Sequence, residues 1–283
     1  MKQIGPVLNK LCKERLSPYG FVRKNRLFLR IKNDVIHTCN LIKVTGLPIY
    51  SVEFEVLPLC MEQPVYLSSG GIYRMDEFTT DHEKFGGWVC DPNFKLSARN
   101  ESELLLDAID THLLPFFERC SSCKAALSEV LLLEELIDNN RKTILKRENL
   151  QDLAEPWRER ALSDSRKYYM ALKAGNYEFA REFLQHQLNV MESQLRQSAQ
   201  NTYRYHIEQL NAGNEAFFCD VVKRNEIQMR AHILKEYGIK DRGRFSVLNG
   251  KDAEPSPVLF IQIRAPLILL APHNFPRIIA YSM

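Results

Sequence analysis

Three consecutive segments near the start of the chain alternate between apolar and polar residues, and they constrain the fold more than any other feature. The first two, residues 26–32 and 35–44, flank the pair Asn33-Asp34, which tolerates the left-handed backbone of a tight hairpin turn. A period of two residues is typical of a strand whose two faces meet different surroundings. Three such strands with short links predict an antiparallel meander.

The third segment, residues 49–57, has the clearest alternation. Its apolar residues share one face and its polar residues the other: Tyr50, Val52, Phe54 and Val56 against Ser51, Glu53 and Glu55. We therefore expect this strand to have one face exposed to water. Shorter strands are expected at 65–68 and 86–90.

Two helices are expected to pack on this sheet. Residues 2–16 place their apolar side chains on one stripe, and Gly20 follows as part of a stop signal. A second helix follows the capping-box pattern that starts at Asn100. Pro115 is expected to end or kink this helix, because proline lacks the backbone N–H that a helix interior uses.

The chain changes character after residue 120, where helical periodicity replaces strand alternation. Helices are expected at about 122–148, 156–174, 177–199 and 202–237. The predicted fold class is α+β: an antiparallel meander sheet packed with two helices, followed by a mostly α-helical C-terminal part. The predicted domains are an α+β domain, a helical region and a Pro-rich apolar tail, for which both a packed and a free arrangement stay open: 1–120, 121–242 and 243–283.

Composition sets the class and the compartment that we expect. The chain has 283 residues, of which 45% are hydrophobic, so it can bury a sizeable core. The apolar stretch 258–271 is interrupted by polar residues and is shorter than the roughly 20 residues of a membrane span. The start of the chain has no apolar run typical of a signal peptide, and the seven cysteines are an odd number, which favours reduced thiols. These features predict a cytoplasmic protein without a membrane partner.

Local charge is more informative than the formal net charge of +3, which is too small to imply a partner. Residues 1–32 carry nine Lys or Arg and one acid, whereas residues 76–118 carry ten acids and three basic residues. The interpretation that we favour is a basic and an acidic element that attract each other within one domain. The alternative is a polar binding surface.

The N-terminal part, about residues 5–120, resembles the family of bacterial domains of unknown function numbered 4304. Three pieces carry the resemblance: residues 20–24 (GFVRK) leading into the first strand, 86–89 (GGWV) and 113–118 (LLPFFE). The resemblance implies an α+β domain with an antiparallel sheet. It implies no established reaction, cofactor or catalytic residue.

Residues 168–188 resemble one helix–turn–helix unit of a tetratricopeptide-type repeat, with Gly175 at the turn and Ala171 and Ala180 beside it. No second copy at a fixed period is evident, so the sequence predicts a plain helical hairpin rather than a solenoid.

Several groups of reactive side chains are candidates for a catalytic or a metal site. Cys120 and Cys123 have the spacing of a redox pair, and a helix start can depress the pKa of the first thiol, but a structural pair is the favoured interpretation. The loop residues Asp81, His82 and Glu83 are the strongest acid–base candidates. Three histidines lie on separate predicted helices and could come together in a helical bundle: His186, His206 and His232. The chain has no nucleotide-binding glycine motif and no four-ligand zinc pattern, so no cofactor and no metal is predicted.

The candidate binding surface is basic and lies in the first strands. It consists of Arg23, Lys24, Arg26, Arg30 and Trp88, the last beside a Gly-Gly pair that permits close approach. Interleaved Phe21 and Phe28 would suit a nucleic-acid surface. The favoured alternative places both rings in the core with the charges facing water, and Trp88 in the core as well.

These observations favour a non-catalytic protein-interaction module with a protein partner. An immunity or antitoxin type of module is suggested by class analogy alone. The first alternative is an enzyme with its site between sheet and helices, using Asp81, His82 or Glu83. The second is a weak nucleic-acid binder acting through the basic N-terminal face.

Overall fold

The computed structural model confirms an α+β fold in which a sheet is followed by helices. The structure describes residues 4–24, 27–43, 49–62, 73–78, 88–90, 102–147, 161–162, 164–191 and 197–238. The expected tail 243–283 and the expected strand 65–68 lie outside these residues. None of the helices that the structure describes combines the length and the apolar character that a membrane crossing requires.

The sheet is the antiparallel meander that the sequence predicts. Its central strands are β2 (Leu27–Lys32), β3 (Val35–Lys43) and β4 (Ile49–Pro58). An unpredicted short strand, β1 (Val22–Lys24), pairs with the first half of β2 and forms one edge. Two further short strands, β5 (Tyr73–Arg74) and β6 (Trp88–Val89), both pair with β4 on its other side.

The turn between β2 and β3 connects the sheet to the helical part. Asn33 has a φ of 54°, the left-handed conformation that was expected of this pair. Its side-chain amide donates to the carbonyl of Ser121 at 2.8 Å. The carboxylate of Asp34 accepts from the backbone N–H of Cys123 at 2.9 Å, at the first residue of helix α5 (Cys123–Arg147). A side chain from the turn therefore caps a helix that begins 89 residues later.

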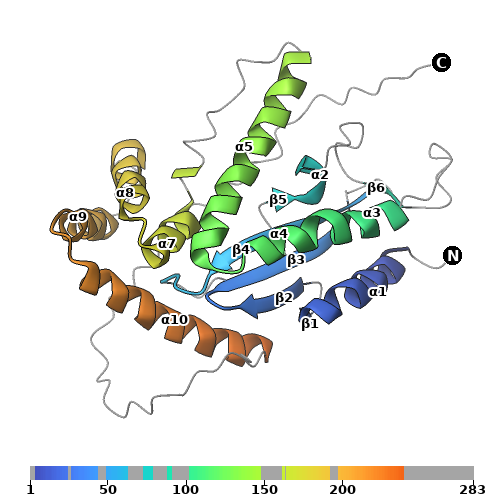
Figure 1. The fold of residues 1–283 in the computed structure, drawn as a ribbon, viewed down its shortest axis with the longest axis horizontal. Helices are drawn as coiled ribbons and strands as arrows, with labels where there is room; N and C mark the ends of the chain where they lie inside the picture. The colour runs from blue at the N-terminus through green and yellow to red at the C-terminus, as the bar shows by residue number, and fades with distance from the viewer. Residues whose placement is uncertain are drawn as a thin grey trace.

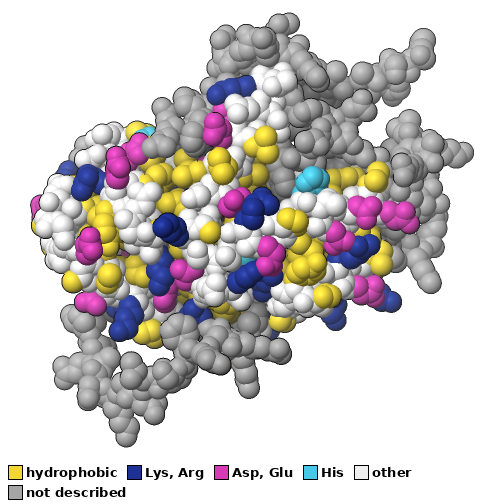
Figure 2. Space-filling view, viewed as in Figure 1, with side chains coloured by type: hydrophobic (Ala, Val, Ile, Leu, Met, Phe, Trp, Pro, Cys, Tyr) yellow, Lys and Arg dark blue, Asp and Glu magenta, His cyan; other side chains and the backbone are white. Residues whose placement is uncertain are grey.

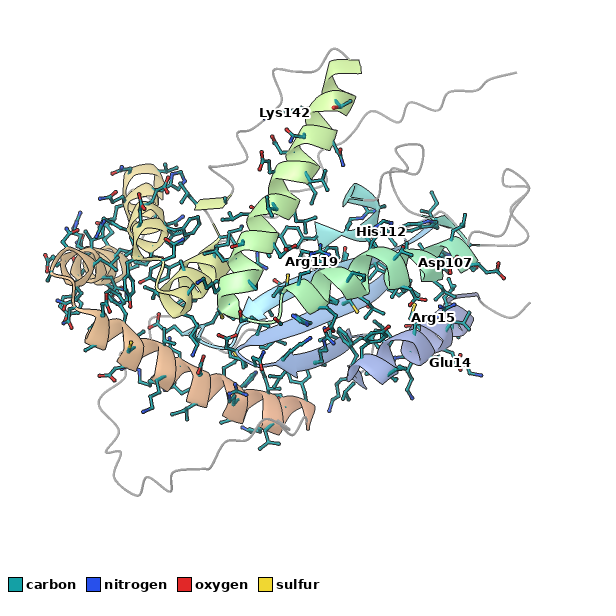
Figure 3. All side chains as sticks on the ribbon, viewed as in Figure 1. Glu14, Arg15, Asp107, His112, Arg119 and Lys142 are labelled. Atoms are coloured by element: carbon teal, nitrogen blue, oxygen red, sulfur yellow. The ribbon has the colours of Figure 1, made fainter. Side chains whose placement is uncertain are left out.

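The two predicted helices cover one face of the sheet (Figure 1). Helix α1 (Ile4–Leu16) and the helical run from Ser102 to Arg119 lie side by side across the strands. Their apolar side chains meet the sheet residues Phe28 and Phe54, and Phe54 packs against Phe117 with ring centroids 6.0 Å apart. Arg15 of α1, labelled in Figure 3, forms an ion pair with Asp110 of the neighbouring helical run.

Of the two outcomes expected at Pro115, an end or a kink, the structure excludes the first: the helical run does not end there. Helix α3 (Ser102–Ala108) passes into a π turn (Ile109–Leu113) and continues as α4 (Leu114–Arg119). Within the π turn the N–H of Leu114 donates to the carbonyl of Ile109, one residue further back than in an α-helix. The wider turn directly before Pro115 lets the chain continue where a regular helix would place the proline ring against the preceding turn.

The opposite face of the sheet is covered by the last described helix, α10 (Glu215–Tyr237), which runs along one side of the strands in Figure 1. Met229 and Ile233 of α10 pack on a second buried apolar cluster formed by the sheet and its following turn: Leu27, Leu29, Ile36, Leu57 and Leu59. The sheet is therefore enclosed on both faces: by α1 and the helical run 102–119 on one face, and by α10 on the other.

The polar side of β4 is not the exposed face that was expected. Ser51 is fully buried, and its hydroxyl donates to the carboxylate of Asp76. The side chain of Glu55 is only 12% exposed and pairs with Arg166 of α7 (Ser165–Ala174). Alternation predicted which residues share a face, but not that polar partners from other elements would cover that face.

The helical part contains α5, α7, α8 (Tyr177–Met191), α9 (Gln197–Asn211) and α10. Helix α5 projects from the body, and Lys142 lies near its far end in Figure 3. The expected single helix at 202–237 is wrong, because Gly213 has a φ of 64° and ends α9 before α10 begins. Residues 197–199, expected in the helix before, belong to α9.

The turn of the helical hairpin has a counterpart further along the chain. The triplet Ala-Gly-Asn occurs at 174–176 and again at 212–214. In each turn the asparagine side chain caps the following helix. Oδ1 of Asn176 accepts from the backbone N–H of Phe179 at 3.2 Å, and Oδ1 of Asn214 accepts from that of Phe217 at 3.3 Å. Two helix–turn–helix units with matched turns therefore follow each other along the chain.

One buried apolar cluster runs from Leu8 in α1 to Val222 in α10. It crosses residue 120, where the sequence predicts the end of the first domain, so the sheet and the helices of the second region share this core. The domain division at 120 stays a prediction.

Candidate functional site

The structure separates the residues of the predicted binding surface. Arg23 and Lys24 are exposed on the edge strand β1. Trp88 is only 3% exposed and belongs to the core. Arg30 is only 6% exposed, although one end of its side chain lines a pocket. Arg26 lies outside the described residues. Phe21 and Phe28 are buried, which confirms the interpretation that these rings belong to the core.

Arg30 enters the interior because β2 turns its side chain toward His37 on β3, the residue directly opposite. The Nε–H of Arg30 donates to Nδ1 of His37 at 3.0 Å, and Nε2 of His37 lies 2.8 Å from the carbonyl oxygen of Cys120. Since Nδ1 accepts, the imidazole proton resides on Nε2 and the ring is neutral. Burial, with the nearby Arg30 charge, lowers the pKa of His37 to about 3.

The other end of the Arg30 guanidinium meets the surface. Its Nη1 donates to the carbonyl of Tyr19 at 2.9 Å and pairs with Oε1 of Glu118 at 2.8 Å. The second oxygen of Glu118 pairs with the ammonium group of Lys32. Nη2 of Arg30 is buried and has no hydrogen-bond partner among the described residues. One donor of a nearly buried cation is thus left unsatisfied, which is costly unless something else satisfies it.

Glu118 is the anionic partner of both cations. Its partial burial alone would raise its pKa, but the hydrogen bonds from Lys32 and Arg30 outweigh that effect and hold the pKa below its ordinary value. The interpretation that the basic start of the chain and the acidic segment 76–118 attract each other is confirmed by these pairs and by the pair of Arg15 with Asp110.

An open pocket of about 490 Å³ lies over these groups. It is lined by Pro18, Tyr19, Gly20, Arg30, Ile31, Lys32 and Glu118. Two cations and one carboxylate give it a surplus of positive charge. Gly20, with a φ of 83°, turns the chain from the short helix at 17–19 toward β1 and shapes one wall.

The pocket lies where the sheet edge is incomplete. β1 pairs with residues 27–29 of β2 only, and on that side no strand among the described residues pairs with Arg30, Ile31 and Lys32. We call this region the basic edge: the exposed β1 residues Val22, Arg23 and Lys24, together with the pocket over residues 30–32. An unpaired strand segment offers backbone groups to another chain, and the surrounding charges would favour an acidic one.

A second constellation, which the sequence analysis missed, joins the sheet to the helices. Lys167 of α7 is almost fully buried, and its Nζ pairs with Glu134 at 2.7 Å and Asp164 at 3.0 Å. Tyr73 of β5 donates its hydroxyl proton to Glu134 at 2.7 Å. Its members come from distant parts of the chain, so no local motif announces it. Because the buried ammonium is matched by carboxylates, this cluster is a structural connection between α5, α7 and the sheet edge.

The surroundings of Cys120, Cys123 and His206 do not suit a redox or an acid–base role. Cys120 and Cys123 are fully buried. Burial raises the pKa of Cys120, and a hydrogen bond with Cys60 together with burial raises the pKa of Cys123. The lowered pKa that a redox pair would require of its first thiol, Cys120, is therefore not supported. Nδ1 of His206 lies 2.8 Å from the hydroxyl of Tyr168, and burial lowers the pKa of His206 to about 4.

The enzyme alternative depends on residues that the structure does not describe, since Asp81, His82 and Glu83 all lie between the described ranges. Within the described ranges, no group of three or more His, Cys, Asp or Glu side chains is arranged to hold a metal ion. The face seen in Figure 2 has basic and acidic side chains interspersed, so this face shows no broad basic patch for phosphate binding.

Comparisons with protein-family models, with curated proteins and with solved structures found no match to this chain. The resemblance of residues 5–120 to the family of domains of unknown function therefore stays a prediction, and the site is interpreted from its own geometry.

Proposed function

We propose that this chain is a protein-interaction module that binds an acidic, extended segment of another protein at the basic edge. The observation that carries the proposal is the unpaired side of Arg30, Ile31 and Lys32, which adjoins the exposed basic strand β1. Main-chain hydrogen bonds to this segment would supply part of the affinity, and the cations would select an acidic sequence.

A short edge strand with Lys and Arg also prevents sheet edges from aggregating, and that role requires no partner. Two further features support binding. The pocket of about 490 Å³ is lined by residues 18–20, which precede β1, and by residues 30–32. Tyr19, which lines it, and Val22 of β1 are each 46% exposed although both are large apolar side chains. A partner bound at the pocket would bury these two apolar side chains.

The partner is defined here by its chemistry only. An immunity or antitoxin type of function, in which a small protein blocks another, agrees with a binding edge, but it rests on class analogy. The family resemblance of the first 120 residues adds no activity to this proposal.

The test is affinity capture from a lysate of the native host with three forms of the full chain. The double substitution R23E/K24E reverses charge on β1, and K223E/R224E makes the same charge change at exposed positions of α10. We expect one acidic protein at stoichiometric amount with the unmodified chain and with K223E/R224E, and its loss with R23E/K24E.

Equal retention by both double variants would contradict the placement of the site on the basic edge. If the unmodified chain retained no protein, the proposal of an interaction module would lose its support. Matched melting temperatures of the variants would show that lost retention does not reflect lost folding.

A further inference from the structure

We propose that the pocket over Arg30 and Lys32 is a carboxylate-binding site, and that Glu118 occupies it as a built-in competitor when no ligand is bound. This inference rests on the proposed interaction function and adds the chemical group that the pocket recognises. The ligand is a carboxylate of the partner, either an acidic side chain or a chain terminus.

The first support is the way in which Glu118 sits between the cations. One carboxylate oxygen pairs with Nη1 of Arg30 and the other with Nζ of Lys32. Two cations on alternate residues of one strand point to the same face, and here they hold the two oxygens of one carboxylate. A carboxylate from another chain would find the same two donors at the same spacing.

The second support is the unequal burial of the groups involved. The side chain of Arg30 is 6% exposed, whereas that of Glu118 is 43% exposed. Arg30 is fixed by His37, by the carbonyl of Tyr19 and by the ring of Phe21, whose centroid lies 4.7 Å from the guanidinium carbon. The cation is therefore preorganised, and the exposed glutamate is the partner that can rotate away.

The third support is the unsatisfied donor. Nη2 of Arg30 is buried but forms no hydrogen bond with any of the described residues. An incoming carboxylate that pairs with both Nη atoms would satisfy it, as a fork-shaped guanidinium commonly does. Nη2 has almost no accessible surface in the present arrangement, so this contact requires the side chains around it to move.

Competition has a measurable consequence. A ligand that binds only when Glu118 has left has an apparent affinity reduced by the fraction of time for which the pocket is vacant. Removing the charge of Glu118 would raise the affinity for a carboxylate about five- to tenfold, if its two ion pairs together are worth about 1–1.4 kcal/mol.

The experiment titrates the full chain with three hexapeptides by calorimetry or by NMR. The first, acetyl-(Glu-Thr)3-amide, offers side-chain carboxylates only. The second, acetyl-(Gln-Thr)3 with a free C-terminus, offers a terminal carboxylate only. The third, acetyl-(Gln-Thr)3-amide, is uncharged. The proteins are the unmodified chain, E118Q, K32Q and the control E14Q, which removes the same charge from an exposed residue of α1.

We expect E118Q to bind at least one of the two carboxylate peptides about five- to tenfold more tightly than the unmodified chain and E14Q do. K32Q should bind that peptide more weakly, and the uncharged peptide should not gain affinity in E118Q. The peptide that responds identifies whether side-chain or terminal carboxylate is the ligand.

The inference is overturned if E118Q and E14Q bind both carboxylate peptides with equal affinity, or if no peptide binds to any form. Either result leaves the interaction function to the capture experiment, because a partner lost only with R23E/K24E would still place binding on β1. Failure of the capture experiment together with a response of E118Q would instead show a small-ligand site without a protein partner.

Discussion

His37 shows at the scale of single residues how the fold sets the charge of a side chain. It is fully buried, accepts a hydrogen bond from Arg30 and stacks on Phe117 with ring centroids 4.7 Å apart. A second positive charge at this position would face the guanidinium without solvent, so the folded state keeps the ring neutral. Arg30 retains its position in the pocket because this ring remains an acceptor.

Acid should destabilise the protein through His37. Its pKa is about 3 in the folded chain and about 6.5 in an unfolded one, so the unfolded state binds more protons between these values. The contribution to stability is complete above pH 6.5 and is lost as the pH falls toward 3, with an upper limit on the order of 5 kcal/mol. Urea unfolding across this range should show a smaller loss for His37→Gln than for the unmodified chain.

His232→Gln, at a half-buried position of α10, is the matched control. It should follow the unmodified chain across the same range. An identical pH dependence of all three forms would contradict the assignment of this effect to His37.

Asp34 is a second residue whose role depends on distant parts of the chain. Its carboxylate accepts from the backbone N–H at the start of α5. Asp34→Ala should lower the free energy of unfolding by about 0.5–2 kcal/mol, the usual loss for a capping side chain. Asp107→Ala, which removes an exposed carboxylate from α3, should change it by less than about 0.5 kcal/mol. Equal losses in denaturant unfolding would argue against the cap.

Residue-level prediction from the sequence succeeded where the information was local. Phe21 and Phe28 were expected in the core because they alternate with charges along a strand, and both are buried. The left-handed turn at Asn33 followed from residue type alone. The burial of Arg30 had no local signal, because its partner Glu118 lies 88 positions away in the chain and the receiving histidine is on the next strand.

At the scale of elements, the sequence predicts the positions of most strands and helices, but not all of the breaks between helices. Strand alternation and helix periodicity predicted β2, β3, β4, α1 and α5 to within a few residues. The π turn before Pro115 was not predicted, since it has no recognised sequence signature here. The break at Gly213-Asn214 was missed although Gly175-Asn176 carries the same signal and was recognised.

Helix α10 should stabilise the protein only through the side chains on the face that packs against the sheet. Ile233 is fully buried against the sheet, whereas its neighbour Leu234 is 50% exposed. Ile233→Ala should cost about 2–5 kcal/mol of unfolding free energy, and Leu234→Ala less than about 0.5 kcal/mol. Equal costs in chemical denaturation would contradict the packing of α10 on the sheet.

The cluster around Lys167 should behave as a buried ion network. Lys167→Met leaves the carboxylates of Glu134 and Asp164 without their common cation, and the expected cost is about 3–5 kcal/mol. Lys10→Met, whose side chain is 76% exposed, is the control and should change stability by less than about 0.5 kcal/mol. A small effect of Lys167→Met in thermal and chemical unfolding would show that the network contributes little.

At the scale of the whole molecule, the α+β class was predictable and the closure of the fold was not. Patterns of two and of 3.6 residues separate the strands from the helices, and this suffices for the class. They do not reveal that α10 returns to the sheet, or that the turn at Asp34 caps α5. Of the candidate site, the basic residues of the first strands were expected from the sequence. Their partner Glu118 was not, because it lies 88 positions from Arg30 in the chain.

An isolated fragment of residues 1–120 should not unfold cooperatively. It would expose Leu29, Ile36 and Leu57, which are almost fully buried in the full chain. Differential scanning calorimetry should show a sharp transition for the full chain and none for the fragment, which we also expect to aggregate. A sharp transition of the fragment would support the domain boundary at 120 instead.

The central claim is that an acidic extended segment binds at the basic edge. Hydrogen–deuterium exchange of the full chain, with and without acetyl-(Glu-Thr)3-amide, measures this directly, because a paired strand protects backbone amides from exchange. We predict slower exchange in residues 30–32, and no slowing there with R23E/K24E. Protection confined to other parts of the chain, or equal protection in R23E/K24E, would contradict the claim.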